Sequence, residues 1–260
     1  MEYVDEPRQP VAVFRPLRSA PISRAFMFTC IGLFVAQMLV RVGAHKDLLT
    51  QYLSLDTQAV LGGQIWRVLT YELIHDTGTI FHILFNLLAF YFFAPAIEQA
   101  LGARKFVIFL LAATIAPAAI CLIAYPHVSV LGASGVVFAV LVAFILKWPR
   151  ATVIFFIFPM PALYMGLILI GIELYSTFLS AVDQPSGIAH FAHLGGAAVG
   201  AIWVKMGPML ERIRSRRKVD SEANDELRAD EILKKISARG IGSLSSRERK
   251  FLESYSRKRL

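Results

Sequence analysis

Two long stretches of the chain contain no basic residue. Lys and Arg are absent from 106–146 and from 151–204, and the acidic residues within them are Glu173 and Asp183. A helix that crosses a bilayer needs about 20 largely apolar residues, so each stretch has room for two crossings and a short turn. The composition agrees, since 56% of the residues are hydrophobic and only 18% are charged. These features predict an all-α polytopic membrane protein.

Two further apolar segments raise the predicted number of membrane spans to six. The predicted spans are 26–44, 81–100, 105–124, 133–147, 162–182 and 188–206. Basic residues gather before the first span and after the second, fourth and sixth spans. The loops on the opposite side hold only Arg41, Lys46 and Arg67. The positive-inside rule therefore places both termini in the cytoplasm, and an even number of spans likewise requires them to share a side. Because no organellar presequence is visible, a bacterial plasma membrane is expected.

The chain is expected to divide into three parts: a cytoplasmic tail at 1–25, a six-helix membrane domain at 26–207 and a basic cytoplasmic tail at 208–260. The last part changes in character, because 211–260 holds 15 basic and 9 acidic residues. An amphipathic helix that ends before Gly240 is predicted there. Ser245 and Glu248 have the spacing of a capping box for a second helix. The pair suits contact with anionic lipid, and its mixed charges argue against a nucleic-acid partner.

Ser134 lies at the start of the predicted fourth span, in the string Gly132-Ala133-Ser134-Gly135. A serine hydroxyl becomes a useful nucleophile only when a base lies within hydrogen-bond reach. The first turn of a helix also offers backbone N–H groups to an oxyanion. Small residues in this pattern serve helix packing as well, and the string taken alone favours the packing role.

His193, in the predicted sixth span, favours the catalytic role. Gly196 and Gly200 form a small-residue face on the turns after His193, and Gly135 and Ala139 begin a matching face directly after the serine. If these faces pack together, Ser134 and His193 lie near one another toward the external ends of their spans. The sequence places no acidic residue beside His193, which indicates a two-residue dyad. His190, one helical turn earlier, is an alternative base.

His82 and Asn86 supply a third polar pair near the external start of the second span. Their i, i+4 spacing puts both on one face of a helix. Each can donate a hydrogen bond, which suits stabilisation of the oxyanion in a tetrahedral intermediate. The alternative is that they bond to neighbouring helices and hold the bundle together.

These motifs resemble those of the rhomboid intramembrane serine proteases. The resemblance covers about 26–206 and rests on three motifs in order: His82-x-x-x-Asn86, Gly132-x-Ser134-Gly135 and Ala192-His193-x-x-Gly196-x-x-x-Gly200. Trp66-Arg67, Glu98 and Gly102 also match. The resemblance implies a six-helix bundle, a water-filled active site open to the external side, a 45–80 loop in the outer leaflet anchored by Arg67, and a mobile fifth span as substrate gate.

Two positions depart from the rhomboid pattern. Phe138 stands where many relatives have a tyrosine that stacks on the catalytic histidine, and Ala94-Pro95 replaces a usual glycine. A phenyl ring keeps the stacking, so we expect activity to survive the first change. The second change affects the local packing of the second span.

The predicted function is that of an intramembrane serine endopeptidase. Ser134 and His193 are the expected catalytic residues, and His82 and Asn86 the expected oxyanion donors. Transmembrane protein substrates and membrane lipids are the expected partners. Other classes of intramembrane protease fit poorly, because the sequence lacks H-E-x-x-H for zinc and a pair of aspartates within spans. No metal or cofactor is expected. The alternatives are an inactive rhomboid-like protein that binds membrane proteins, and a small transporter or channel.

Overall fold

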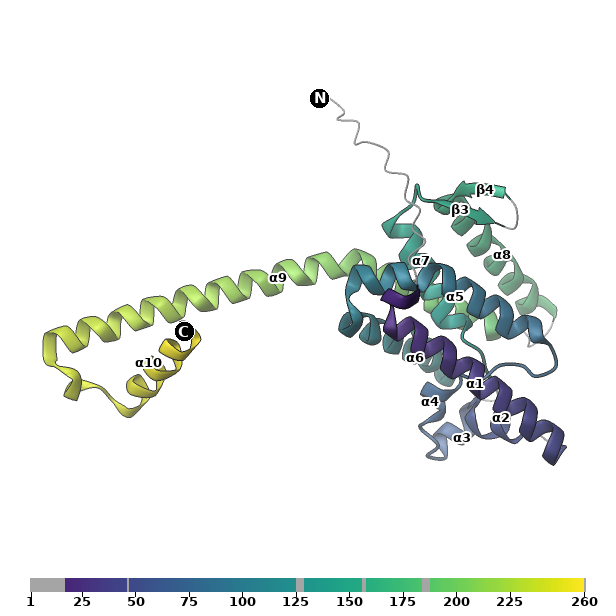
Figure 1. Cartoon of the computed structure of the whole chain (residues 1–260), viewed down its shortest axis with the longest axis horizontal. Coiled ribbons are helices and arrows are strands. Elements are labelled where there is room, and N and C mark those ends of the chain that lie inside the picture. The colour runs from purple at the N-terminus through teal and green to yellow at the C-terminus, as the bar shows by residue number, and fades with distance from the viewer. Residues whose placement is uncertain (1–16, 46, 125–128, 156–157, 184–187, 260) are drawn as a thin grey trace, which may run out of the picture. The chain divides into compact units, whose positions relative to one another are not determined.

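The computed structural model describes residues 17–45, 47–124, 129–155, 158–183 and 188–259, and it is mostly helical (Figure 1). A long helix lies at each of the six segments predicted to cross the membrane. These helices are α1 (Pro21–Ala44), α5 (Ile80–Leu101), α6 (Ala103–Ala124), α7 (Ser134–Lys147), α8 (Ala162–Asp183) and α9 (Ile188–Arg239).

Three of these helices have the length and hydropathy of a membrane span. Within the described residues they are α1, α5 and α6 as far as Ile123. Helix α7 and the part of α8 up to Ile172 are apolar but shorter. The protein is therefore an integral membrane protein, and the sixfold crossing remains a prediction.

The segment between α1 and α5 folds into three short helices and one strand. They are α2 (Leu48–Leu53), β1 (Leu55–Asp56), α3 (Thr57–Leu61) and α4 (Arg67–Thr70), and β1 pairs antiparallel with β2 (Ser129–Val130). Asp47 and Asp56 cap α2 and α3 by accepting a backbone N–H three residues later. The buried Arg67 donates to the carbonyls of Ser54 and Gln51 at 2.7 and 2.8 Å. Arg67 thus holds this segment together from within, whereas its depth in the bilayer remains a prediction.

A short hairpin connects α7 to α8. Strand β3 (Thr152–Phe155) pairs antiparallel with β4 (Phe158–Pro161), with Thr152 opposite Pro161. The prolines of this segment indicated a break before the fifth span, and α8 begins at Ala162, directly after Pro161. The hairpin itself was not predicted. Its signal in the sequence is the β-branched and aromatic run at 152–155, which favours strand.

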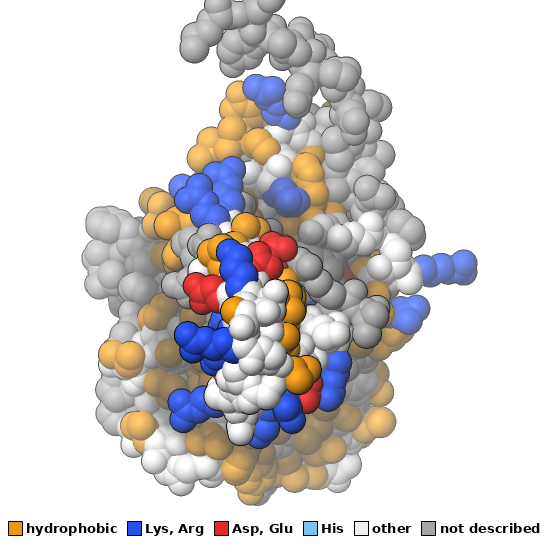
Figure 2. Space-filling model, turned by 90° about the vertical axis from the view of Figure 1, so that its left-hand side faces the viewer, with side chains coloured by type: hydrophobic (Ala, Val, Ile, Leu, Met, Phe, Trp, Pro, Cys, Tyr) orange, Lys and Arg blue, Asp and Glu red, His pale blue; other side chains and the backbone are white. Residues whose placement is uncertain are grey.

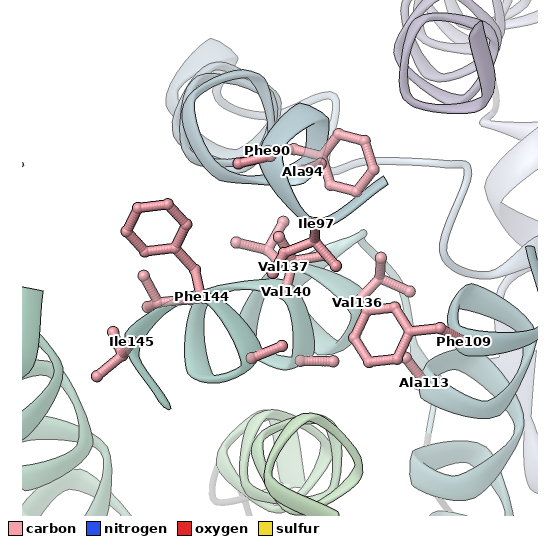
Figure 3. Close-up of a cluster of buried hydrophobic side chains, with 14 of the residues drawn as sticks. Phe90, Ala94, Ile97, Phe109, Ala113, Val136, Val137, Val140, Phe144 and Ile145 are labelled. Atoms are coloured by element: carbon pink, nitrogen blue, oxygen red, sulfur yellow. The ribbon is translucent and has the colours of Figure 1, made fainter. Parts of the chain in front are cut away.

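Helix α7 forms the centre of the membrane part and packs against α5, α6 and α8. Figure 3 shows Phe90 and Ile97 of α5 and Phe109 of α6 beside Val136 and Val140 of α7, all of them buried. Within a bilayer such packing stabilises mainly through van der Waals contact, because lipid tails are as apolar as the side chains. The helix that begins at Ser134 is thereby fixed by its neighbours along its length.

The start of α1 is capped by a carboxylate from α5. Glu98, which is 2% exposed, accepts the backbone N–H groups of Ile22 and Ser23 at 2.9 and 2.7 Å and the Ser23 hydroxyl at 2.6 Å. Ala20, the residue before α1, offers no side-chain cap. Because these hydrogen bonds run from the start of α1 to a side chain of α5, Glu98 joins the two helices.

The chain divides into two compact units, residues 1–204 and 205–260. Helix α9 runs without a break from Ile188 to Arg239. The sequence predicted a span at 188–206 followed by a separate amphipathic helix, and the Gly207–Pro208 pair between them does not interrupt the helical backbone. Proline removes one backbone hydrogen bond but can be accommodated within a helix.

The second unit contains the predicted helix pair. Gly240, with φ 73°, follows Arg239 and ends α9, and α10 (Ser246–Arg259) comes after a short 3₁₀ turn at Ile241–Ser243. The capping box is confirmed: Ser245 donates its backbone N–H to Glu248 at 2.7 Å, and Glu248 donates its backbone N–H to the Ser245 hydroxyl at 3.3 Å. On the face shown in Figure 2, basic side chains are interspersed with acidic and apolar ones.

Candidate active site

Ser134 is the first residue of α7, and the turn before it requires glycine. Gly132 has φ 112°, in the left-handed region that residues with a Cβ seldom adopt. The Gly132 N–H donates to the Tyr71 carbonyl at 2.9 Å, and the Ala133 N–H donates to Nε2 of His75 at 3.5 Å. The segment after α4 therefore holds the turn that presents the half-buried Ser134.

His193 belongs to α9, and its side chain packs against the face of α7 that carries Ser134. The imidazole of His193 stacks on the ring of Phe138, with 4.7 Å between ring centroids and 8° between planes. Phe138 follows Ser134 by four residues, and residues at that spacing share one helical face. The stacking expected of a phenyl ring at this position is thus present.

Helices α7 and α9 pack through the small residues that the sequence singled out. A Cβ added to Gly196 would collide with the carbonyl of Gly135, and a Cβ added to Gly200 would collide with the carbonyl of Ala139. Both contacts advance in the same direction along the two helices, so α7 and α9 run parallel and begin on the same side. The predicted match between the two small-residue faces is confirmed.

His82, the third residue of α5, lies against the turn before Ser134. Its Nδ1 accepts the Asp76 backbone N–H at 3.2 Å, which in a neutral ring leaves the hydrogen on Nε2. That Nε2 is 2.7 Å from the position that a Cβ of Gly132 would occupy. His82 is also near enough to His193 for an electrostatic interaction. The edge of the His82 ring that carries Nε2 therefore lies against the turn before Ser134.

Asn86 lies one turn further along α5 and is 8% exposed. Its side-chain amide donates to the backbone carbonyl of His82 at 2.9 Å. This bond uses one of the two N–H groups of the amide. The bond fixes Asn86 to the same turn of α5 as His82, in agreement with their predicted common face.

His75 supports this arrangement from the loop after α4, and it was missed by the sequence reasoning. Its backbone N–H and C=O both bond to the side chain of Gln37 on α1, at 3.1 and 3.0 Å. Its ring meets the ring of His82 edge-on, with centroids 5.3 Å apart. Burial, and then the nearby His82, lower the pKa of His75 to about 4, so the ring is neutral at pH 7 and Nε2 can accept from Ala133. His75 lies outside any helix or strand, so no hydrophobic periodicity in the sequence could identify it as a buried residue.

The structure gathers most of the predicted site residues around the first turns of α7. His82 contacts the turn before Ser134, and His193 packs on Phe138 just after it. The alternative base His190, and Glu173, the acid within the predicted fifth span, have side chains outside the described part of the structure.

Fold and site together define a helical integral membrane protein with a cluster of one serine and several histidines at the start of a central helix. The Rhomboid domain family matches residues 62–208. The chain belongs to the rhomboid family.

Two relatives illustrate the range of this similarity. The chain is 32% identical over 181 residues to rhomboid protease GlpG of Haemophilus influenzae, covering 67% of this chain and 84% of that protein. It is 31% identical over 165 residues to the mitochondrial RHOMBOID-like protein 12 of Arabidopsis thaliana, covering 55% of this chain and 47% of that protein. The chain thus spans about half the length of the plant relative. Residues 220–258 match a second family, of unknown function (DUF6576).

Proposed function

We propose that the protein is an intramembrane serine endopeptidase that cleaves transmembrane segments of membrane proteins near the external membrane face. The observation that carries the proposal is the stacking of His193 on Phe138, at 4.7 Å between centroids, on the helical face of Ser134. This contact supports a role for His193 as the base that activates Ser134. The similarity to a protease of the same family supports this assignment.

The proposed mechanism uses a dyad. His193 removes the proton of the Ser134 hydroxyl, and the oxygen attacks a peptide carbonyl of the substrate. The backbone N–H of Ser134, Nε2–H of His82 and the amide of Asn86 hold the oxyanion. His193 then protonates the leaving amine, and a water molecule activated by His193 releases the acyl-enzyme. Each step needs only groups of this chain, the substrate and water.

The proposed topology has six spans, both termini in the cytoplasm and the site toward the external side, in a bacterial plasma membrane. Helix α8 is proposed as the substrate gate, since the β3–β4 hairpin joins it to α7 without continuous helix. A transmembrane helix hides its own carbonyls in hydrogen bonds, so substrates must unwind locally before attack. Substrates with glycine near the external face are therefore preferred, because glycine weakens a helix by about 1 kcal/mol.

The test is cleavage of a single-span test substrate by the purified protein in liposomes. One substrate carries two glycines near the external end of its span, and its matched control carries leucine at the same positions. We expect cutting of the first near the glycines and much slower cutting of the second. If both substrates remain intact but bind to the protein, the inactive membrane-protein-binding alternative is correct instead.

Loss of the His82 imidazole tests the proposed oxyanion role. We expect His82→Ala to lower kcat by about 10²- to 10³-fold, because one oxyanion donor is lost, and to leave KM within a few-fold. The matched control is His45→Asn, at an exposed histidine with φ 54° at the end of α1, where asparagine suits the backbone. Steady-state kinetics on the glycine substrate measure both. An unchanged kcat in His82→Ala rules out the assigned role.

A further inference from the structure

One buried acid beside the site has no part in the proposed mechanism. Glu72 follows α4 by two residues and is 1% exposed. In the described part of the chain, neither of its carboxyl oxygens has a hydrogen-bond partner of good geometry, although the Tyr71 hydroxyl and the Val136 backbone amide are near enough to interact with it. A buried polar group without a firm partner is costly, so its presence calls for a functional account.

The carboxyl group of Glu72 points at the first turn of α7. Its Oε1 is 2.9 Å from the position that a Cβ of Gly135 would occupy, so the carboxyl occupies the space that the absent side chain leaves. The first N–H groups of a helix have no acceptor within that helix. Ala133, the residue before α7, provides no side-chain cap. Glu72 stands where a cap is needed, and it comes from a different element.

The backbone around Glu72 is tied to the same turn. The Tyr71 carbonyl accepts the Gly132 N–H at 2.9 Å, and the Tyr71 hydroxyl donates to the Thr114 carbonyl of α6 at 2.9 Å. Any movement of Glu72 relative to α7 must therefore strain the connection to the turn before Ser134.

The environment of Glu72 favours its neutral form. Burial raises its pKa to about 8, against a weaker lowering by Tyr71 and the Val136 amide. Within the described residues, the titratable groups facing it are the Cys30 thiol of α1 and the Tyr71 hydroxyl. Burial raises the pKa of Tyr71, which keeps its proton. Cys121 of α6 faces Tyr71 in turn. No Lys or Arg within α7 precedes Lys147, so no nearby cation from that helix compensates a charge on Glu72.

We propose that Glu72 is a positioning residue, whose carboxyl fills the gap at Gly135 against the first turn of α7 and so fixes the direction of the Ser134 hydroxyl. The inference rests on the proposed protease function. At neutral pH the group is a carboxylic acid; as it ionises, the new buried charge displaces the turn, and turnover falls without loss of substrate binding.

The test compares Glu72→Gln, which keeps the shape and the neutral charge, with Glu72→Leu, which keeps the volume alone. For the wild type we expect kcat to fall about tenfold between pH 7 and pH 9, as one group of pKa about 8 loses its proton. Glu72→Gln keeps kcat constant over that range, and Glu72→Leu lowers kcat about tenfold at every pH with KM within twofold. The matched control is Glu98→Gln, a buried acid that caps α1, which destabilises the fold but keeps the alkaline decline.

A stability measurement gives a second readout that is independent of activity. The folded protein holds the Glu72 proton up to about pH 8, whereas an ordinary glutamate loses it near pH 4.5. Folding stability attributable to this group is therefore complete below pH 4.5 and falls as the pH rises to about 8. The midpoint of thermal unfolding in detergent should show this fall for the wild type and not for Glu72→Gln.

The two proposals fail in different ways. An alkaline decline that is unchanged in Glu72→Gln, or full kcat in Glu72→Leu, overturns the positioning role while the protease function stands. A folded wild type that cleaves no substrate at any pH overturns the protease function, and the positioning role falls with it.

Discussion

We expect Ser134→Ala to lower kcat by at least about 10³-fold, because the proposed mechanism has no other group at the start of α7 to form the acyl-enzyme. We expect an effect of similar size for His193→Ala, since the serine would then lack its proposed base. The double variant is expected to be no worse than either single variant, because residues that act as one unit are not additive. Rates of product formation from the glycine substrate, measured for the three variants, give the comparison.

The matched control for this loss is Ser129→Ala. The Ser129 hydroxyl donates to the Ser54 hydroxyl at 3.1 Å, within the pairing of β1 with β2. Its removal costs about 1 kcal/mol of stability at most and leaves turnover intact. Retained cutting by Ser134→Ala would mean that the nucleophile lies elsewhere.

Gly196→Val is expected to have the largest effect on stability, a loss of about 3 kcal/mol in the free energy of unfolding. The new Cβ meets the backbone carbonyl of Gly135, which cannot move as a flexible side chain does, so α7 and α9 must separate. Separation also removes His193 from the face of Ser134. Both the midpoint of thermal unfolding in detergent and the rate of cleavage should fall.

Gly171→Val provides the control for this prediction. Gly171 also lies in an apolar helix, α8, but a Cβ added there meets no other atom within 4 Å. We expect its unfolding free energy to stay within about 0.5 kcal/mol of the wild type, as for other substitutions in open space. Equal stability of the two valine variants would contradict the close approach of α7 and α9.

Regular features of the fold were predictable from the sequence because they depend on local pattern. The apolar stretches predicted helices at all six positions, and the start of α8 after Pro161 follows from proline chemistry. The capping box of Ser245 and Glu248 depends on spacing alone. The contact between α7 and α9 was predictable because glycine and alanine at four-residue intervals allow helices to approach closely.

The remaining features depend on contacts between distant parts of the chain. The cap that Glu98 gives to α1 joins residues 75 positions apart in sequence, and no local signal marks it. His75 and Glu72 lie in irregular backbone, where neither period nor motif identifies a residue that faces α7. The continuity of α9 was missed because the Gly207–Pro208 pair resembles a helix end, yet the helical backbone passes through it.

The most direct measurement of the central claim is labelling of the folded protein with a serine-directed phosphonate, followed by mass spectrometry of the peptides. Only a serine activated by a neighbouring base reacts readily with such a reagent. We expect a single adduct on Ser134 in the wild type, and none there in His193→Ala at equal folded fraction. No adduct on the folded wild type, or an adduct that persists on Ser134 without His193, would contradict the proposed pairing of the two residues.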